Sequence, residues 1–120
     1  MKVYAIHHVQ LAMPAGEEDK ARSFYSEVLG IAETPKPPHL AVRGGVWFED
    51  GDLKIHLGVE KDFRPAKKAH PALLVTGLDM IVEKCTSAGY GVTFDEPLAG
   101  CRRVYASDPF GNRIELMETE

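Results

Sequence analysis

The chain of 120 residues consists of two halves that repeat the same order of elements. In each half a strand-like segment precedes a helix-like segment that ends at a glycine, and three strand-like segments follow. Gly30 lies 26 positions before His56, and Gly89 lies 26 positions before Glu115. This repeated spacing predicts an α+β fold made of two tandem βαβββ modules.

In the first half, residues 3–13 alternate between two faces in the manner of a β-strand, and Pro14 ends the pattern. Acidic residues then open a helix-like stretch whose apolar stripe includes Phe24 and Tyr25 and which stops at Gly30. The proline-rich stretch 34–40 is expected to be a loop. Segments 44–49 and 53–59 predict a hairpin with its turn at 50–52.

Residues 60–69 are polar and irregular, so we expect a linker between modules at about 3–59 and about 70–119 of a single domain, 1–120. The second module starts with a strand at 70–75. Residues 76–79 fit a capping box, which predicts a helix that ends at Gly89. Strands are expected at 91–98, 101–107 and 112–118, with a tight turn at 108–112 between the last two. Glu118 and Glu120 are expected to form a solvated tail.

Strand parity assigns the histidine pair at positions 7 and 8 to opposite faces. His8 shares the more polar face with Gln10, whereas His7 is expected to lie against the helix and to be dispensable for metal binding. In the strand 53–59, His56 lies on the polar face. His39 lies in the proline-rich loop and is expected to have no role in the site.

The second half has a comparable polar face. There Glu115 follows Arg113 at a spacing of two, and a five-residue turn would place Tyr105 directly opposite Glu115 and Arg103 on the same face. Under the repeat, His8 corresponds to His70, and His56 corresponds to Glu115. Four potential metal ligands therefore occupy two equivalent places in two copies of one module.

Composition excludes some classes of function. A net charge of −4, with Lys67–Lys68 as the one short basic cluster, argues against nucleic-acid binding. The chain has no apolar run long enough to span a membrane and no signal-peptide core, so we expect a cytoplasmic protein. Cys85 and Cys101 form no CxxC motif and are expected to be reduced thiols.

The segments IHHVQLAMPAGEEDKARSFYSEVLGI near the start and DPFGNRIELME near the end resemble the vicinal oxygen chelate superfamily. This superfamily includes glyoxalases, fosfomycin-resistance thiol transferases, extradiol dioxygenases and bleomycin-binding proteins. The resemblance covers nearly the whole chain. It implies curved mixed sheets that form a cup around a divalent metal ion, and a homodimer. Its metal ligands, carried over by position, are His8, His56, His70 and Glu115.

The resemblance also implies roles for other residues. The catalytic candidates are His56, Glu115 and Tyr105, and the candidates for substrate binding are Gln10, Arg103, Tyr105 and Arg113. Arg103 and Arg113 would bind an anionic substrate or form salt bridges at the rim. Glyoxalases usually carry glutamate where His56 stands, so His56 is a fourth ligand, a supporting group or a base.

These features predict a metal-dependent enzyme, with a glyoxalase-like lyase or isomerase as the leading hypothesis. The cofactor would be Zn²⁺, Ni²⁺, Mn²⁺, Co²⁺ or Fe²⁺, bound so that coordination positions stay open for the substrate. An extradiol-type dioxygenase and a thiol transferase are alternatives within the enzyme class. The alternative from another class is a metal-free, bleomycin-type binding or resistance protein.

Overall fold

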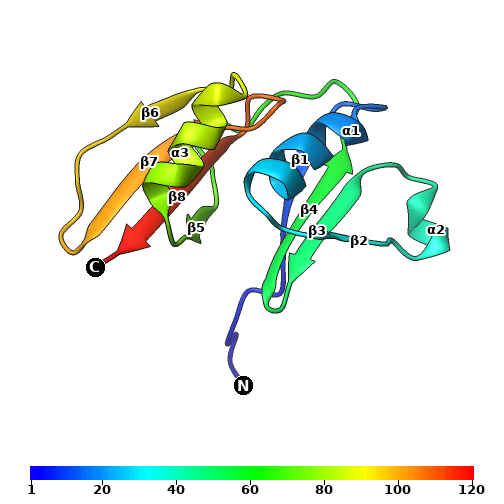
Figure 1. The fold of residues 1–120 in the computed structure, drawn as a ribbon. Coiled ribbons are helices and arrows are strands. Elements are labelled where there is room, and N and C mark those ends of the chain that lie inside the picture. Colours follow the sequence, from blue (N-terminus) through cyan, green and yellow to red (C-terminus); the bar gives the residue numbers. More distant parts are fainter. The chain divides into compact units, whose positions relative to one another are not determined.

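The computed structural model describes all residues from 1 to 120, and the chain divides into two compact units, Met1–Arg64 and Pro65–Glu120. The expected linker at 60–69 spans the boundary between them. Each unit contains a four-stranded sheet with helical segments on one of its faces (Figure 1). The structure contains no helix that is long and apolar enough to cross a membrane.

Along the chain, the first unit begins with a strand and a helical segment and ends with a β-hairpin. Its elements are β1 (Val9–Met13), α1 (Glu18–Ala21), the π-helical η1 (Arg22–Val28), β2 (Glu33–Thr34), α2 (Pro38–Ala41), β3 (Val46–Asp50) and β4 (Leu53–Val59). The strand order is β1-β4-β3-β2, and only β1 and β4 run parallel. The predicted hairpin is therefore present as β3 and β4, with Gly51 at a positive φ of 58° in its turn.

The second unit repeats this arrangement. Its elements are β5 (Ala72–Leu74), α3 (Leu78–Ser87), β6 (Val92–Phe94), β7 (Cys101–Ser107) and β8 (Arg113–Thr119). The strand order is β5-β8-β7-β6, and again only the first and last strands run parallel. The predicted turn at 108–112 joins β7 to β8 and is closed by a 2.9 Å hydrogen bond from the Asp108 amide to the Asn112 carbonyl.

The two sheets agree in register as well as in order. Gln10 pairs with His56 in the first sheet, and Ala72 pairs with Glu115 in the second. His8 and His70 each lie two residues before those partners. The predicted α+β fold of two tandem βαβββ modules is confirmed.

Apolar side chains on the helix-facing side of each sheet form the cores. In the first unit Phe24 and Tyr25 are fully buried, and the Tyr25 ring stacks on Phe48 at a centroid distance of 5.4 Å. In the second unit α3 packs against β6 and β8 (Figure 1). Its Cys85 is a free, fully buried thiol whose pKa is raised by burial. The opposite face of each sheet carries polar and aromatic side chains and is called its polar face below.

The prediction of a strand over residues 3–13 is wrong for its first part, because β1 begins only at Val9. Val9 pairs with Ile55, and β4 itself begins at Leu53. Residues before His7 would have to pair with the hairpin turn, which presents no strand. The apolar residues Val3, Tyr4 and Ile6 are exposed in consequence.

Three local predictions also need correction. Gly77, in the left-handed conformation, precedes α3 without a side-chain cap, so the capping box at 76–79 is absent. The Gly77 amide instead donates to Glu118 Oε1 at 2.8 Å, so Glu118 is part of β8 and not of a solvated tail. The proline-rich stretch contains one helical turn, α2, because proline is favourable at the first helical position.

The packing of Tyr25 on Phe48 gives a direct test of the first core. We expect Phe48→Ala to lower the free energy of unfolding by about 3–5 kcal/mol, because it leaves a cavity under the helix. Phe94→Ala removes the same ring from a side chain that is 76% exposed and should change stability by no more than about 0.5 kcal/mol. Urea unfolding followed by circular dichroism measures both, and equal losses would contradict the assignment of the core.

Candidate functional site

Most of the candidate residues gather on the polar faces of the two sheets. Trp47 lies opposite His56 in the first unit, and Tyr105 lies opposite Glu115 in the second. The second pairing agrees with the predicted position of Tyr105. Since cross-strand partners share a face, an aromatic side chain lies beside His56 in the first sheet and beside Glu115 in the second, at equivalent positions of the two modules.

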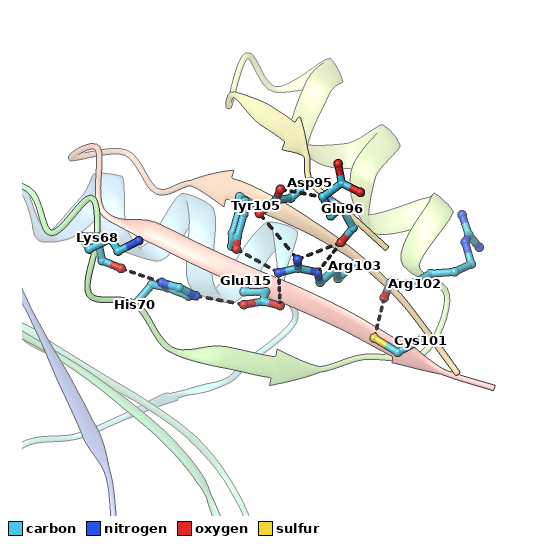
Figure 2. A network of polar contacts seen from close by, with 9 residues as sticks. All are labelled: Lys68, His70, Asp95, Glu96, Cys101, Arg102, Arg103, Tyr105 and Glu115. Atoms are coloured by element: carbon cyan, nitrogen blue, oxygen red, sulfur yellow. Dashed lines mark hydrogen bonds and ion pairs between the residues drawn. The ribbon is translucent and has the colours of Figure 1, made fainter. Parts of the chain in front are cut away.

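His70 and Glu115 form a direct pair in the second unit (Figure 2). The His70 Nε2 atom lies 2.9 Å from Glu115 Oε1, and His70 Nδ1 lies 2.8 Å from the carbonyl oxygen of Lys68. The carbonyl can only accept, so Nδ1–H donates a hydrogen bond to it, and a neutral imidazole carries only one N–H group. In that tautomer Nε2 presents its lone pair to the carboxylate.

This pair suits a divalent metal ion. A nitrogen lone pair and a carboxylate oxygen at 2.9 Å need a shared proton or a cation to hold them together. Ligand atoms about 2.1 Å from a metal ion, in neighbouring coordination positions, lie roughly 3 Å apart. The Lys68 carbonyl supplies the outer hydrogen bond that fixes the orientation of a metal-binding imidazole. The donor set and its support therefore fit the metal that the sequence led us to expect.

Arg103 engages the remaining oxygen of Glu115. Its Nη1 donates to Glu115 Oε2 at 3.3 Å and to the Tyr105 hydroxyl at 2.9 Å, while Nε and Nη2 donate to the carbonyl of Glu96. Burial acts to lower the pKa of Arg103, but the hydrogen bonds with Tyr105 and Glu115 raise it overall. Arg103 is thus a fixed cation that orients Glu115 (Figure 2).

Tyr105 connects this pair to further charges. The Glu96 amide and the Tyr105 phenol lower the pKa of Asp95, whose carboxylate also lies 3.6 Å from Arg103 Nη2. The Arg113 guanidinium lies over the Tyr105 ring at 4.6 Å from its centroid, a cation–π contact. The phenol is therefore held in one orientation by groups on both sides.

The first unit holds a stack of three rings. His56 is buried. Its ring stacks on the Trp47 ring at a centroid distance of 4.2 Å and on the exposed His8 ring at a centroid distance of 4.5 Å. Its Nε2 lies 2.7 Å from Glu49 Oε2. The carboxylate accepts, so Nε2 donates and Nδ1 is left as the basic nitrogen. Burial lowers the pKa of His56, and the bond to Glu49 partly offsets that effect.

The stacked rings of His8 and His56 do not converge on one point. An imidazole binds a metal ion in the plane of its ring, at about 2.1 Å. Two planes that are only 19° from parallel, with ring centroids 4.5 Å apart, have no common point so close to both rings. In this arrangement the two histidines do not bind the same ion.

His7 differs from expectation. It is exposed and does not lie against the helix, because the chain here precedes β1. Its Nδ1 lies 3.0 Å from His8 Nδ1, and its Nε2 lies 3.3 Å from Lys54 Nζ. The split of the histidine pair by strand parity is therefore wrong for His7, which lies beside His8.

The other candidates have ordinary surroundings. A Cβ atom at Gly58 would lie 2.5 Å from Gln10 Nε2, so the glycine makes room for the Gln10 side chain on the polar face. His39 is exposed on α2. No group of three or more His, Cys, Asp or Glu side chains gathers in the structure as a metal site. What it brings together are the pairs His8–His56 and His70–Glu115.

Sequence reasoning missed Trp47 and Glu49 in the first unit and Asp95 and Glu96 in the second. The first two had a signal, because Trp47 occupies the place in the hairpin that Tyr105 occupies in the second module. Glu49 follows at the next position on the same face. Asp95 and Glu96 lie after the end of β6, where strand parity no longer applies.

A family model described as the Glyoxalase/Bleomycin resistance protein/Dioxygenase superfamily matches residues 5–116. The chain belongs to this superfamily. A protein from Bacillus anthracis assigned to the glyoxalase family is 47% identical, with 100% of this chain and 98% of that chain covered, at a TM-score of 0.92. No curated protein matches the sequence.

More distantly similar solved structures share the fold. The fosfomycin resistance protein FosX from Listeria monocytogenes is 15% identical, covering 99% of this chain and 94% of that chain, with a TM-score of 0.80. TnmS3, an antibiotic binding protein from Streptomyces sp. CB03234, is 21% identical, covering 99% of this chain and 100% of that chain, with a TM-score of 0.73. The superfamily fold thus serves both resistance and binding proteins.

The environment of His56 predicts a pH dependence. Because burial lowers its pKa below 6.5, the folded protein binds fewer protons here than the unfolded chain, and this residue lowers stability as the pH falls through 6.5. In metal-free protein we expect the NMR titration midpoint of His56 to lie below 6.5. Glu49→Gln should lower that midpoint further, whereas Asp52→Asn, an exposed change in the same hairpin, should not. An unchanged midpoint in Glu49→Gln would refute the assigned hydrogen bond.

Proposed function

We propose that this member of the superfamily is a metal-dependent lyase or isomerase of the glyoxalase type that acts on a small substrate. The observation that carries the proposal is the His70–Glu115 pair, whose atoms and outer hydrogen bonds suit a divalent cation. His8 is a further ligand on the family resemblance. The metal is Zn²⁺, Ni²⁺, Mn²⁺, Co²⁺ or Fe²⁺, and the first four suit a reaction without redox chemistry.

When bound, the divalent metal ion supplies Lewis-acid chemistry toward two neighbouring oxygens of the substrate. The protein has to supply the proton transfer. We assign that role to His56, because burial keeps it neutral near pH 7 and Glu49 fixes Nε2 as the donor, which leaves Nδ1 to take a proton. This assignment makes His56 a base and not a fourth ligand.

The second unit supplies orientation and charge. Arg103 holds Glu115 and the Tyr105 hydroxyl in fixed places, so it is a positioning residue. Tyr105 presents its phenol beside this carboxylate, and Gln10 lies on the polar face of the first sheet. Tyr105, Gln10 and Arg113 are the proposed contacts with the substrate.

The proposal includes the homodimer and the cytoplasmic location that the sequence led us to expect. One feature supports a protein partner. The residues before His7 precede β1, and Val3, Tyr4 and Ile6 expose their apolar side chains. Packing of a second copy of the chain on this segment would remove its apolar side chains from water, which is favourable in free energy.

The stack of Trp47, His56 and His8 favours a second candidate function, a metal-free protein that binds a small molecule. Three stacked rings offer an apolar surface on which a flat ligand can lie. TnmS3, which shares the fold, is described as an antibiotic binding protein. Metal affinity separates the two candidates, because the binding protein needs none.

Metal binding is the first test of the proposal. Calorimetric titration of metal-free protein with Zn²⁺ or Mn²⁺ should show saturable binding. Removing an outer hydrogen-bond partner of a metal ligand typically costs 10–100-fold in affinity, so His70→Ala and Glu115→Ala, which remove ligands, should each cost about 100-fold or more. His8→Ala should weaken binding as well.

The matched control is His39→Ala, which removes an exposed histidine from α2. Its affinity for the metal should equal that of the unmodified protein. Equal affinity in Glu115→Ala and His39→Ala, or no binding by the unmodified protein, would overturn the metal-dependent reading and favour the binding protein.

The proposed role of His56 as the catalytic base can be tested by proton exchange. Metal-loaded protein should catalyse exchange of a carbon-bound proton into ²H₂O in a panel of hemithioacetals and α-hydroxycarbonyl compounds, followed by NMR. His56→Gln should keep its metal and lose about 100-fold or more of the rate, the usual worth of a general base. Loss of the metal in His56→Gln would make it a ligand. Oxygen uptake with a catechol and Fe²⁺ would point to a dioxygenase instead.

A further inference from the structure

The second unit contains a pocket of about 190 Å³ whose lining includes Tyr105 and Arg113, two of the proposed contacts with the substrate. Lys67 and Arg113 bring two cations to its lining, and the lining also includes the hydroxyl-bearing residues Thr93, Tyr105 and Ser107. No carboxylate lines it. A pocket lined by cations and hydroxyl groups matches the hydrogen-bonding needs of an oxyanion.

The cross-strand register explains why the hydroxyl groups gather. Thr93 pairs with Tyr105 in β6 and β7, and Ser107 pairs with Arg113 in β7 and β8. Alternation along β7 places Tyr105 and Ser107 on the same face. The pocket therefore lies on the polar face, one pair along the strands from Glu115, which Tyr105 opposes.

Two backbone bonds bring Lys67 to this place. The Arg113 amide donates to the carbonyl of Ala66 at 2.8 Å, and the Ala66 amide donates to Asn112 Oδ1 at 2.9 Å. Gly111 permits the approach, since it has a φ of +91° and its missing Cβ would lie 3.3 Å from Pro65. Lys67, the next residue, is held beside the start of β8.

The charge balance favours an anionic guest. Neither Lys67 nor Arg113 takes part in an ion pair with a carboxylate, and the Arg113 guanidinium lies over the Tyr105 ring. The carboxylates nearby are engaged elsewhere. Glu115 contacts His70 and Arg103, and Asp95, whose charge reaches Arg113, contacts Arg103 and the Glu96 amide.

The equivalent positions in the first module carry different charges. By register, Lys54 occupies the place of Arg113 in the first unit, and Glu49 occupies the place of Ser107. The Glu49 carboxylate bonds to His56 there. An acidic residue at this position would repel an anion, so only the second unit has the charge for one.

We infer that this pocket binds an oxyanion group of the substrate, a phosphate, phosphonate or carboxylate, with Lys67 and Arg113 as its cations and the hydroxyls of Thr93 and Ser107 as donors. The assignment of this anion to a substrate rests on the proposed function. Binding of the free anion does not. Arg103 is excluded from the role because its guanidinium is committed to Glu115 and Glu96.

The test titrates metal-free, ¹⁵N-labelled protein with inorganic phosphate and, separately, with acetate, at constant ionic strength. Saturable shifts of the Thr93 and Ser107 amides are expected with at least one of the two, and the tighter one identifies the kind of oxyanion. Lys67→Gln and Arg113→Gln should each weaken binding about ten-fold, the effect of one charge-assisted hydrogen bond. Ser107→Glu, which copies the first unit, should abolish it.

The controls remove exposed cations that take no part in the pocket, Lys84→Gln for lysine and Arg64→Gln for arginine. Both should bind the anion as the unmodified protein does. Equal losses in controls and test variants would mean a general charge effect, and the absence of saturable shifts at these amides would also overturn the inference. Metal affinity of Lys67→Gln, measured in phosphate-free buffer, should be unchanged, so failure of this pocket and failure of the metal site give different results.

Discussion

Parallel pairing between the first and last strands of each unit is the constraint on which the candidate site depends. When a residue of the first strand pairs with a residue of the last strand, the side chain two positions earlier in the first strand lies close to that residue of the last strand. In the second unit this pairing, Ala72 with Glu115, brings His70 to Glu115. In the first unit the same pairing, Gln10 with His56, brings His8 to His56. One backbone rule thus produces two chemically different pairs.

The two pairs differ because their neighbours differ. Glu115 has Arg103 on one oxygen and the Nε2 atom of His70 on the other, so its orientation is fixed. His56 lies between rings, where burial favours its neutral form, and Glu49 selects the nitrogen that carries the proton. An oriented carboxylate oxygen beside an imidazole lone pair suits a cation, and a neutral imidazole suits proton transfer.

Much of the fold could be predicted from the sequence, because alternation and helical spacing are local signals. The internal repeat also allowed the elements assigned in one half to be compared with those of the other half. The register of Tyr105 opposite Glu115 followed from the length of one turn. Local signals failed where tertiary context decides. Residues 3–8 alternate like a strand, but the hairpin turn offers them no partner. At the start of α3 the left-handed Gly77 stands in place of a side-chain cap, and its amide donates to Glu118 from a distant strand.

The candidate site was less accessible to sequence reasoning, for a related reason. The sequence could predict which polar residues lie near the site, but not which of them form hydrogen bonds and ion pairs with one another. Arg103 was expected to bind an anionic substrate or to form salt bridges at the rim, but the sequence did not identify Glu115 as its partner. Lys67 carried no signal at all, because two bonds of Ala66 with β8 and its preceding turn determine its place.

The measurement that tests the central claim most directly is anomalous X-ray diffraction from crystals grown with Mn²⁺ or Zn²⁺. The account predicts a metal peak in bonding contact with both His70 Nε2 and Glu115 Oε1, with His70 Nδ1 still bonded to the Lys68 carbonyl. A metal bound elsewhere while His70 and Glu115 remain directly bonded to each other, or no ordered metal at saturating concentration, would contradict it.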